Sequence, residues 1–465
     1  MARMLPLDPS PEQMRTMGEA ALEAVVSFIS GLETAPAAGE GGGFELARRL
    51  RAAPPEVGGP LEPVLAEVLE AAAHAYETCG PGYLAYIPGG GLFSAALGDF
   101  LALAVNRYVG LAAPSPAVVQ IEENVARWLC SLLGWDERSQ GLLTSGGSMA
   151  NLSATVAARH AKLGEDLARG TYYVSDQAHA SVTKAATLAG FSRRNLRLVP
   201  TDEELRMDVG ALRRMVREDI AAGLRPFLVV ASAGTTNTGA VDPLEAVAEV
   251  AAEHDLWMHV DGAYGGFFIL TERGRERFRG IERADSVTLD PHKGMFLPYG
   301  TGALVVRDGE ELRRAHYEGA AYLQDLAEAG ELPNYSEYSA ELSREWRGLR
   351  VWLPLRLHGV SAFREALDEK LDLAETLYEG LKAIPEIEVP WAPQLTVVPF
   401  RLRDGDDEEN RRLLEAINAS GRVFCSSTTI RGRYVVRACI VSHRTHRDRI
   451  EECIGIVARA AAELR

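Results

Sequence analysis

The sequence predicts an α/β protein with a mostly parallel central sheet, a helical segment before it and a smaller α+β domain after it. In the middle of the 465-residue chain, short apolar β-branched runs alternate with helical segments. This alternation is typical of a sheet with helices on both faces. The region before it shows helical spacing, and from about residue 355 the pattern changes again.

The N-terminal region is predicted to be helical. Apolar residues recur near helical spacing within residues 9–34, at Met14, Met17, Ala21, Leu22, Val25 and Phe28. Stretches rich in glycine, alanine and proline follow at 35–43 and 53–60 and indicate loops. We therefore expect residues 1–78 to form a helical segment packed onto a larger body.

The large central domain is expected at residues 79–350. Strands are predicted at 171–175, 227–232, 256–260, 286–289 and 303–306, and helices at 152–163, after His179 and at 243–254. Ligands of such sheets bind beyond the carboxyl ends of the strands. Polar residues that directly follow these runs are therefore the first candidates for a functional site.

A smaller α+β domain is expected at residues 351–465. A helix is predicted at 361–384, short strands around 395–402 and 434–440, and a final helix at 446–464.

Composition narrows the class of protein. The chain is 47% hydrophobic and 25% charged, as in ordinary globular proteins, and its net charge of −16 argues against nucleic acid or an anionic membrane as the main partner. Neither a spanning helix nor a secretion signal is expected, because no long apolar run is present. The five cysteines are scattered and odd in number, which favours reduced thiols in a cytoplasmic protein.

Two charged residues follow successive predicted strands. Asp261 lies in His-Val-Asp-Gly-Ala-Tyr (259–264), and Lys293 lies in Asp-Pro-His-Lys-Gly (290–294). Either residue alone is usually a solvated surface charge. Together at strand ends they are what a pyridoxal phosphate (PLP) enzyme requires. The lysine amine holds the cofactor aldehyde as a Schiff base, and the carboxylate keeps the pyridine nitrogen protonated.

Three weaker signals fit the same chemistry. Gly146, Gly147 and Ser148 precede a predicted helix, where small residues let backbone N–H groups approach a phosphate; a plain helix cap is the alternative. His179 follows a strand and is either a ring that stacks on a planar cofactor or an ordinary capping histidine. Thr236 follows another strand and either reaches a cofactor oxygen or belongs to a simple turn.

A metal site is not expected. His443 and His446 are three residues apart, and His259 and Asp261 are two apart. No His-Glu-x-x-His motif, cysteine-rich pair or acidic loop accompanies them.

Taken in order, these motifs resemble those of the group II PLP-dependent amino acid decarboxylases, and most of all the aromatic amino acid decarboxylases. The similar segments are Ser-Asp-Gln-Ala-His (175–179), Gly-Thr-Thr (234–236), the two segments around Asp261 and Lys293, and residues 342–352. The resemblance covers nearly the whole chain, and the ordered set is far more specific than any single piece.

The resemblance implies a PLP-dependent transferase-like fold of type I. It also implies a homodimer with shared active sites, in which the N-terminal flap swaps over the partner. Residue by residue, it makes Lys293 the Schiff-base lysine, Asp261 the partner of the pyridine nitrogen and His179 the stacking ring. Ala263 packs beneath the ring, and Thr236 lies near the phenolic oxygen and the substrate. The residues around the phosphate are Gly146, Gly147, Ser148, Asp290 and His292.

The substrate pocket and the proton donor are also expectations from this resemblance. Tyr322 matches a tyrosine that protonates Cα in related decarboxylases, where aldehyde synthases typically have phenylalanine. Ser343 occupies a position where serine goes with smaller rings than indole. The other expected pocket residues are Tyr86, Ile87, Pro88 and Gly89, with Tyr108 and Leu111 contributed by the partner subunit.

The expected activity is decarboxylation of an L-amino acid, with tyrosine, dopa or phenylalanine favoured over tryptophan. The alternatives are an aldehyde synthase, a decarboxylase of a non-aromatic amino acid such as glutamate, and, more remotely, a transaminase or a PLP-binding regulator without enzymatic activity.

Overall fold

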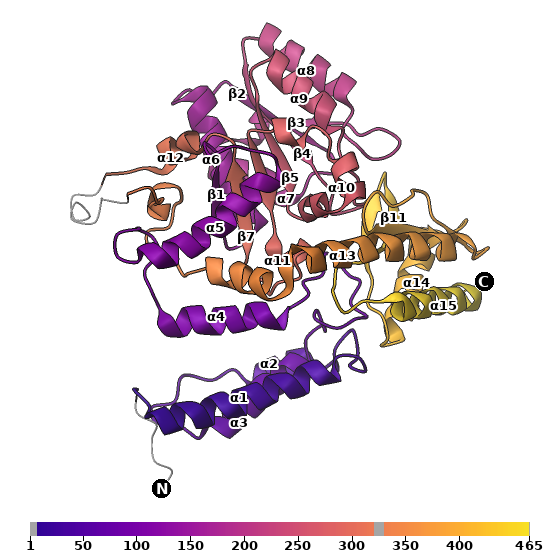
Figure 1. Ribbon diagram of the computed structural model, residues 1–465. Helices are drawn as coiled ribbons and strands as arrows, with labels where there is room; N and C mark the ends of the chain where they lie inside the picture. The colour runs from indigo at the N-terminus through magenta and orange to yellow at the C-terminus, as the bar shows by residue number, and fades with distance from the viewer. Residues whose placement is uncertain (1–6, 320–329, 465) are drawn as a thin grey trace.

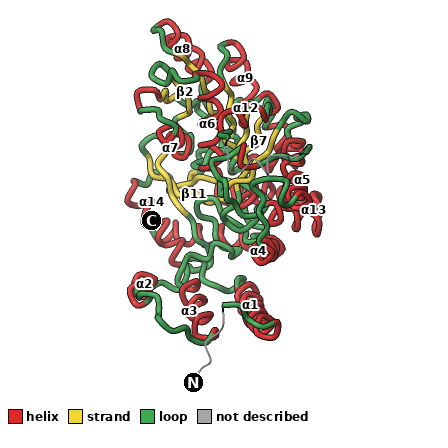
Figure 2. The backbone as a smooth tube through the Cα atoms, turned by 90° about the vertical axis from the view of Figure 1, so that its left-hand side faces the viewer, coloured by secondary structure: helices red, strands yellow, loops and turns green. Residues whose placement is uncertain are grey.

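The computed structural model of the protein describes residues 7–319 and 330–464 (Figure 1). Among these residues, no helix combines the length and apolar character needed to cross a bilayer. Two sheets form the body of the molecule, and the N-terminal helices lie at one end of it in both views (Figures 1 and 2).

The N-terminal segment is helical, as predicted. Its helices are α1 (Pro11–Gly31), α2 (Gly43–Arg49) and α3 (Leu61–Ala73). Ser10 begins α1 with a reciprocal cap, because its hydroxyl accepts the Gln13 N–H while the Gln13 side chain accepts the Ser10 N–H. Helices α1 and α3 pack against each other, yet neither contains a buried residue.

The central sheet has seven strands in the order β1-β7-β6-β5-β4-β2-β3. Strand β7 runs antiparallel to β1 and β6, and the other neighbours are parallel, which confirms the predicted mostly parallel sheet. The bounds are β1 (Gln140–Thr144), β2 (Gly170–Ser175), β3 (Leu196–Val199), β4 (Arg225–Ser232), β5 (Trp257–Gly262), β6 (Ser286–Leu289) and β7 (Gly302–Val306).

Helices surround this sheet, and most of them cover it or connect its strands. They are α4 (Phe93–Val105), α5 (Pro116–Leu132), α6 (Gly147–Leu163), α7 (Ala180–Leu188), α8 (Val209–Ala221), α9 (Leu244–Glu253), α10 (Glu272–Arg277), α11 (Pro291–Gly294) and α12 (Gly309–His316). Helix α4, by contrast, packs against α13 (Gly348–Lys382). The inner strands β4, β5 and β6 are buried almost throughout, as expected for strands covered on both faces.

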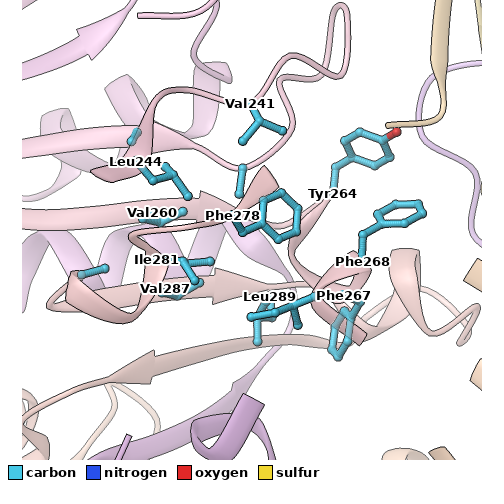
Figure 3. Close-up of a cluster of buried hydrophobic side chains, with 14 of the residues drawn as sticks. Val241, Leu244, Val260, Tyr264, Phe267, Phe268, Phe278, Ile281, Val287 and Leu289 are labelled. Carbon is cyan, nitrogen blue, oxygen red and sulfur yellow. The ribbon is translucent and has the colours of Figure 1, made fainter. Parts of the chain in front are cut away.

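A cluster of apolar side chains holds the ends of β5 and β6 in place. Val260, Val287 and Leu289 of these strands lie near Phe267 and Phe268 of the segment that connects them, and all five are at most 1% exposed (Figure 3). Complete burial of one such side chain stabilises the fold by about 1.5–3 kcal/mol. The cluster therefore fixes the end of β5, which contains Asp261, and the end of β6, which Lys293 follows.

Helix α13 (Gly348–Lys382) connects the central sheet to the smaller one. It is bent at Gly359, whose φ of 74° lies in the left-handed region. The predicted helix at 361–384 matches the part after this bend, and the structure adds an earlier part that begins at Gly348. The proposed domain limit at residues 350 and 351 falls inside the first turn of this helix and stays a prediction.

The smaller sheet is α+β in character, as expected. Its strand order is β10-β11-β9-β8, and every neighbouring pair is antiparallel. The elements are β8 (Ile387–Glu388), β9 (Val397–Leu402), α14 (Asp407–Ala419), β10 (Ser426–Ile430), β11 (Arg433–Cys439) and α15 (Arg447–Glu463). Strand β8 has only two residues, and β10 is rich in serine and threonine, so neither shows the apolar alternation that predicts a strand.

Candidate active site

The functional residues converge where neighbouring parallel strands end. Asp261 lies in β5 and is in register with Ser232 of β4 and Thr288 of β6. Lys293 lies in the short helix α11, which begins directly after β6 and Asp290. The carboxylate and the amine therefore reach the same edge of the sheet from adjacent strands.

A cavity of about 230 Å³ opens at this edge. All ten residues predicted to bind the cofactor line it, namely Gly146, Gly147, Ser148, His179, Thr236, Asp261, Ala263, Asp290, His292 and Lys293. The remaining lining residues were not among the predicted site residues; they are Ser145, Met149, Ser181, Ser232, Gly234, Thr235 and Tyr264.

The N-terminus of α6 faces this cavity through small residues. Gly147 is the first residue of the helix, and a Cβ built there would meet both Ala263 Cβ and Asp290 Oδ2 at 3.0 Å. A side chain at this position would require Ala263 or Asp290 to shift, so glycine suits this close approach. The first N–H groups of a helix have no partner within the helix and carry a partial positive charge. The arrangement therefore suits an anion such as a phosphate.

Lys293 is paired with a buried carboxylate. Its Nζ lies 3.0 Å from Asp290 Oδ2, and His292 Nε2 lies 3.6 Å from the same oxygen. Asp290 is 1% exposed, and its second oxygen, Oδ1, has no hydrogen-bond partner among the described residues. Burial lowers the pKa of His292, while the Asp290 charge opposes this shift. His292 Nδ1 lies 2.6 Å from the Thr301 carbonyl and donates to it.

Two neutral groups donate hydrogen bonds to the Asp261 carboxylate. Asn151 Nδ2 lies 3.1 Å from Asp261 Oδ2, and the Ala263 N–H donates to Oδ1 at 3.1 Å. His259 lies behind Asn151 and is 2% exposed. Burial lowers its pKa to about 4, against the opposing effect of the Asp261 charge, so it is neutral near pH 7.

A buried arginine supports the loop that carries Thr236. Arg437 of β11 is 3% exposed, and burial lowers its pKa. Its guanidinium donates to the Thr236 carbonyl at 2.6 Å and to the Ser426 hydroxyl at 3.0 Å. The same hydroxyl accepts the N–H of Tyr86 at 3.0 Å. One side chain thus links the small sheet to two segments that carry predicted site residues.

Asn151 and Arg437 are polar groups outside the cavity lining that were not predicted from the sequence. Asn151 follows the glycine-rich turn at a helical position, where an amide has no local signature. Arg437 stands between apolar residues of a strand that is buried around it, and this contrast was the only available signal.

None of the predicted substrate residues that the structure describes lines the cavity of a single subunit. Gly89 lies beside a lining residue, because a Cβ built there would lie 3.3 Å from the His292 carbonyl oxygen. Tyr108 donates to the Leu342 carbonyl at 3.1 Å, which places it beside the segment of Ser343. The others are Tyr86, which is exposed, and Ile87, Pro88 and Leu111, which are buried. Tyr322 lies outside the described residues.

These residues fit a phosphorylated pyridoxal ring. An amine and a carboxylate lie at adjacent strand ends, a histidine lines the same cavity, and the glycines at the start of α6 leave the space that an anion needs.

Comparison with known proteins gives the family. The pyridoxal-dependent decarboxylase conserved domain matches residues 46–403. The aromatic-L-amino-acid decarboxylase of Bacillus atrophaeus is 35% identical over 471 residues, which cover 98% of this chain and 97% of that protein.

Solved structures agree over the full length. The crystal structure of Oryza sativa TDC with PLP and tryptamine has a TM-score of 0.93 at 28% identity and covers 99% of both chains. Rhodiola rosea 4-hydroxyphenylacetaldehyde synthase has a TM-score of 0.90 at 25% identity, with 98% of this chain and 99% of that chain covered. These findings confirm the predicted fold, cofactor and reaction class. The chain belongs to the pyridoxal-dependent decarboxylase family and is a PLP-dependent amino acid decarboxylase.

Proposed function

We propose that the substrate is an aromatic L-amino acid, which the enzyme converts to the amine and CO₂, and that tyrosine, dopa or phenylalanine is preferred over tryptophan. The cavity that brings Lys293, Asp261 and His179 together carries the proposal for the site. The names of the similar proteins support an aromatic substrate. Ser343, at a position where serine goes with smaller rings, supports the preference within that class.

The proposed roles follow from the position of each group. Lys293 holds the cofactor through its amine, and Asp261 faces the ring nitrogen, where its negative charge favours the protonated form. His179 stacks on the ring, and Gly147 and Ser148 hold the phosphate at the start of α6. The bound cofactor supplies an electron sink for the electron pair left at Cα when CO₂ leaves.

Asp290 and His292 are proposed to set the charge around Lys293. The carboxylate of Asp290 lies 3.0 Å from the amine and pairs with it. The neighbouring imidazole is kept neutral by burial, so its donation to the Thr301 carbonyl fixes the ring without adding a second positive charge.

Tyr322 is proposed to donate the proton that Cα receives after CO₂ has left. An aldehyde synthase is the second candidate, because a solved structure of one matches this fold closely. The tyrosine at position 322 favours simple decarboxylation, since phenylalanine is typical of the synthases.

The active enzyme is proposed to be a homodimer that completes the substrate pocket. Helix α4 exposes a row of large apolar side chains, and α1 and α3 expose others although they are well-formed helices. They are Met14, Leu22, Val25, Val26, Val64, Val68, Leu69, Phe93, Leu97, Phe100, Leu101, Leu103 and Val105. Apolar surface of this extent is rare on a monomer. A second copy of the chain would cover it and bring further residues to the cavity.

Two measurements test the proposal. Borohydride reduction of the PLP-loaded enzyme, followed by peptide mapping, should label Lys293, and Lys293→Ala should abolish both label and turnover. A label on another residue would overturn the assigned site. A screen of L-amino acids that quantifies CO₂, amine, aldehyde and peroxide should give amine and CO₂ from aromatic substrates. Turnover of glutamate alone, or aldehyde as the main product, would establish the alternative activity.

The dimer has a separate test. Light scattering on the purified enzyme should give twice the chain mass of 50.4 kDa. Replacement of Phe100 by Glu on α4, where this ring is 64% exposed, should shift the mass towards one chain. A monomeric parent would contradict the proposal.

A further inference from the structure

Asn151 lies at the centre of a buried hydrogen-bond network beneath the cavity. It is the fifth residue of α6 and is 1% exposed. Its amide contacts Asp261 Oδ2 at 3.1 Å, Ser181 Oγ at 2.9 Å, Thr288 Oγ1 at 2.7 Å and His259 Nε2 at 3.0 Å. The partners come from β5, α7 and β6, so one side chain joins three elements that meet at the site.

The orientation of this amide follows from its partners. The Thr288 hydroxyl donates to Asn151 Oδ1, so the oxygen of the amide faces Thr288 and its nitrogen faces the Asp261 carboxylate. The Nδ2 group then donates one hydrogen to Asp261 and the other to the Ser181 hydroxyl. The Oδ1 atom accepts from Thr288 and His259. Both hydrogens and both lone pairs of the amide are therefore used.

This orientation fixes the proton on His259. Because Asn151 Oδ1 has no hydrogen to give, His259 Nε2 must carry the proton that joins them. The ring is neutral, so its Nδ1 accepts, and the Ser286 hydroxyl donates to it at 2.8 Å. That hydroxyl in turn accepts the indole N–H of Trp257 at 2.8 Å. The chain of hydrogen bonds thus runs in a single direction towards Asn151.

The same orientation fixes the proton on His179. The Ser181 hydroxyl accepts a hydrogen from Asn151 and is left to donate its own to His179 Nδ1, 2.7 Å away. The Ser181 backbone N–H also donates to this Nδ1, at 3.2 Å. Nδ1 is therefore the acceptor, and the neutral ring carries its proton on Nε2.

We propose that Asn151 is a positioning residue that orients the Asp261 carboxylate and, through the Ser181 hydroxyl, reinforces the Nε2-protonated form of His179 that the Ser181 backbone N–H also favours. One amide would then connect the two groups proposed to lie against the cofactor ring. The inference rests on the roles proposed for Asp261 and His179. It goes beyond those roles, because it explains what orients Asp261 and what favours one protonated form of His179 before the cofactor binds.

The chemistry explains why the position holds an amide. An aspartate of the same shape would place a second carboxylate about 3 Å from Asp261, so that one of the two would have to hold a proton. A leucine would keep the volume but leave the His259 and Thr288 donors without an acceptor. Asn151→Asp and Asn151→Leu therefore disturb the network in different ways.

The test uses two readouts, the first of which needs no cofactor. In the PLP-free enzyme, ¹H–¹⁵N spectra of labelled histidine side chains should show His179, assigned with His179→Gln, protonated on Nε2 only. In Asn151→Leu this single form should be replaced by a mixture. The dissociation constant of PLP, measured by equilibrium dialysis, should rise about 10- to 100-fold, which corresponds to the loss of a hydrogen bond to a charged group.

A matched control separates this role from general support of the fold. Asn410, 0% exposed and the fourth residue of α14, is also a buried helical asparagine, and it donates to Asp406 and accepts from Leu402 far along the chain from the cavity. Asn410→Leu should leave the His179 spectrum and PLP affinity unchanged. If Asn151→Leu does not fold, Asn151→Asp replaces it in the test, because it keeps an acceptor for His259 and Thr288. Asn151→Asp should still weaken PLP binding at least 10-fold.

Two outcomes would overturn the inference. One is an Asn151 variant that folds, binds PLP like the parent and keeps the parent spectrum of His179. The other is an Asn410 variant that changes both readouts equally. Failure of the proposed function is recognised separately, because the parent enzyme would then not be labelled at Lys293 by borohydride.

Discussion

The buried ion pair between Arg344 and Glu122 provides a sharp test of how this fold is stabilised. Both side chains are 0% exposed, and Arg344 Nη1 lies 2.7 Å from Glu122 Oε1. Glu122 Oε2 also accepts the Gly348 N–H at 3.0 Å, and Arg344 donates to the Leu143 carbonyl at 3.0 Å. The pair therefore fixes the segment that carries Ser343 against α5 and β1.

The expected magnitude follows from burial. Glu122→Gln keeps the shape of the side chain and an acceptor for Gly348, but it leaves the Arg344 charge without a counter-ion. Removal of one partner of a buried pair costs about 3–5 kcal/mol, because the remaining charge stays desolvated. The exposed pair of Arg447 and Glu451 on α15 gives a matched control, since its side chains are 75% and 58% exposed. Glu451→Gln should cost no more than about 0.5 kcal/mol.

The measurement is urea unfolding followed by tryptophan fluorescence, at one protein concentration and with saturating PLP, because subunit association and cofactor binding both shift the midpoint. Glu122→Gln should lose about 3–5 kcal/mol of unfolding free energy. The double variant with Arg344→Met should recover part of this loss, since no unpaired charge remains. A Glu122→Gln enzyme within about 1 kcal/mol of the parent would refute this reasoning.

Three further predictions concern the site and its pH dependence. Tyr322→Phe should shift the products from amine towards aldehyde, ammonia and peroxide; amine alone at the parent rate would show that Tyr322 is not the proton donor. Gly147→Ala should weaken PLP binding about tenfold in equilibrium dialysis, because its Cβ would meet two side chains at 3.0 Å and overpacking costs about 1–3 kcal/mol, whereas Gly18→Ala, with no atom within 4 Å, should not. Burial lowers the pKa of His443 to about 3, so below its ordinary value of 6.5 the unfolded chain takes up a proton that the folded chain does not. Stability should therefore fall as pH decreases from about 6.5, by at most about 1.4 kcal/mol per pH unit from this group, and His443→Leu should flatten the profile measured by urea unfolding.

The cofactor site could be predicted because its residues follow strand ends. Parallel strands that neighbour one another end at the same edge of the sheet, so Asp261 and Lys293 had to meet once their strands were recognised. The glycines at 146 and 147 and the histidine at 179 follow a similar rule, since each caps or begins the helix that comes after a strand.

The substrate pocket could not be predicted in the same way. Tyr86 and Ser343 belong to irregular segments whose course depends on contacts far along the chain, such as the bond from the Tyr86 N–H to Ser426. Neither residue lines the cavity within a single subunit. If the pocket is completed by a second subunit, no spacing within a single sequence specifies it.

The sequence alone determined the alternation of strands and helices, the helical N-terminal segment and the order of the cofactor motifs, because these depend on local periodicity and on residues adjacent to strand ends. Only the tertiary structure decided the orientation of the Asn151 amide, the partners of Arg437 and the pairing of Glu122 with Arg344. These groups lie 110, 201 and 222 residues from partners in space. Buried polar groups must find such partners or lose their hydration without compensation, and only the folded chain determines which partners are within reach.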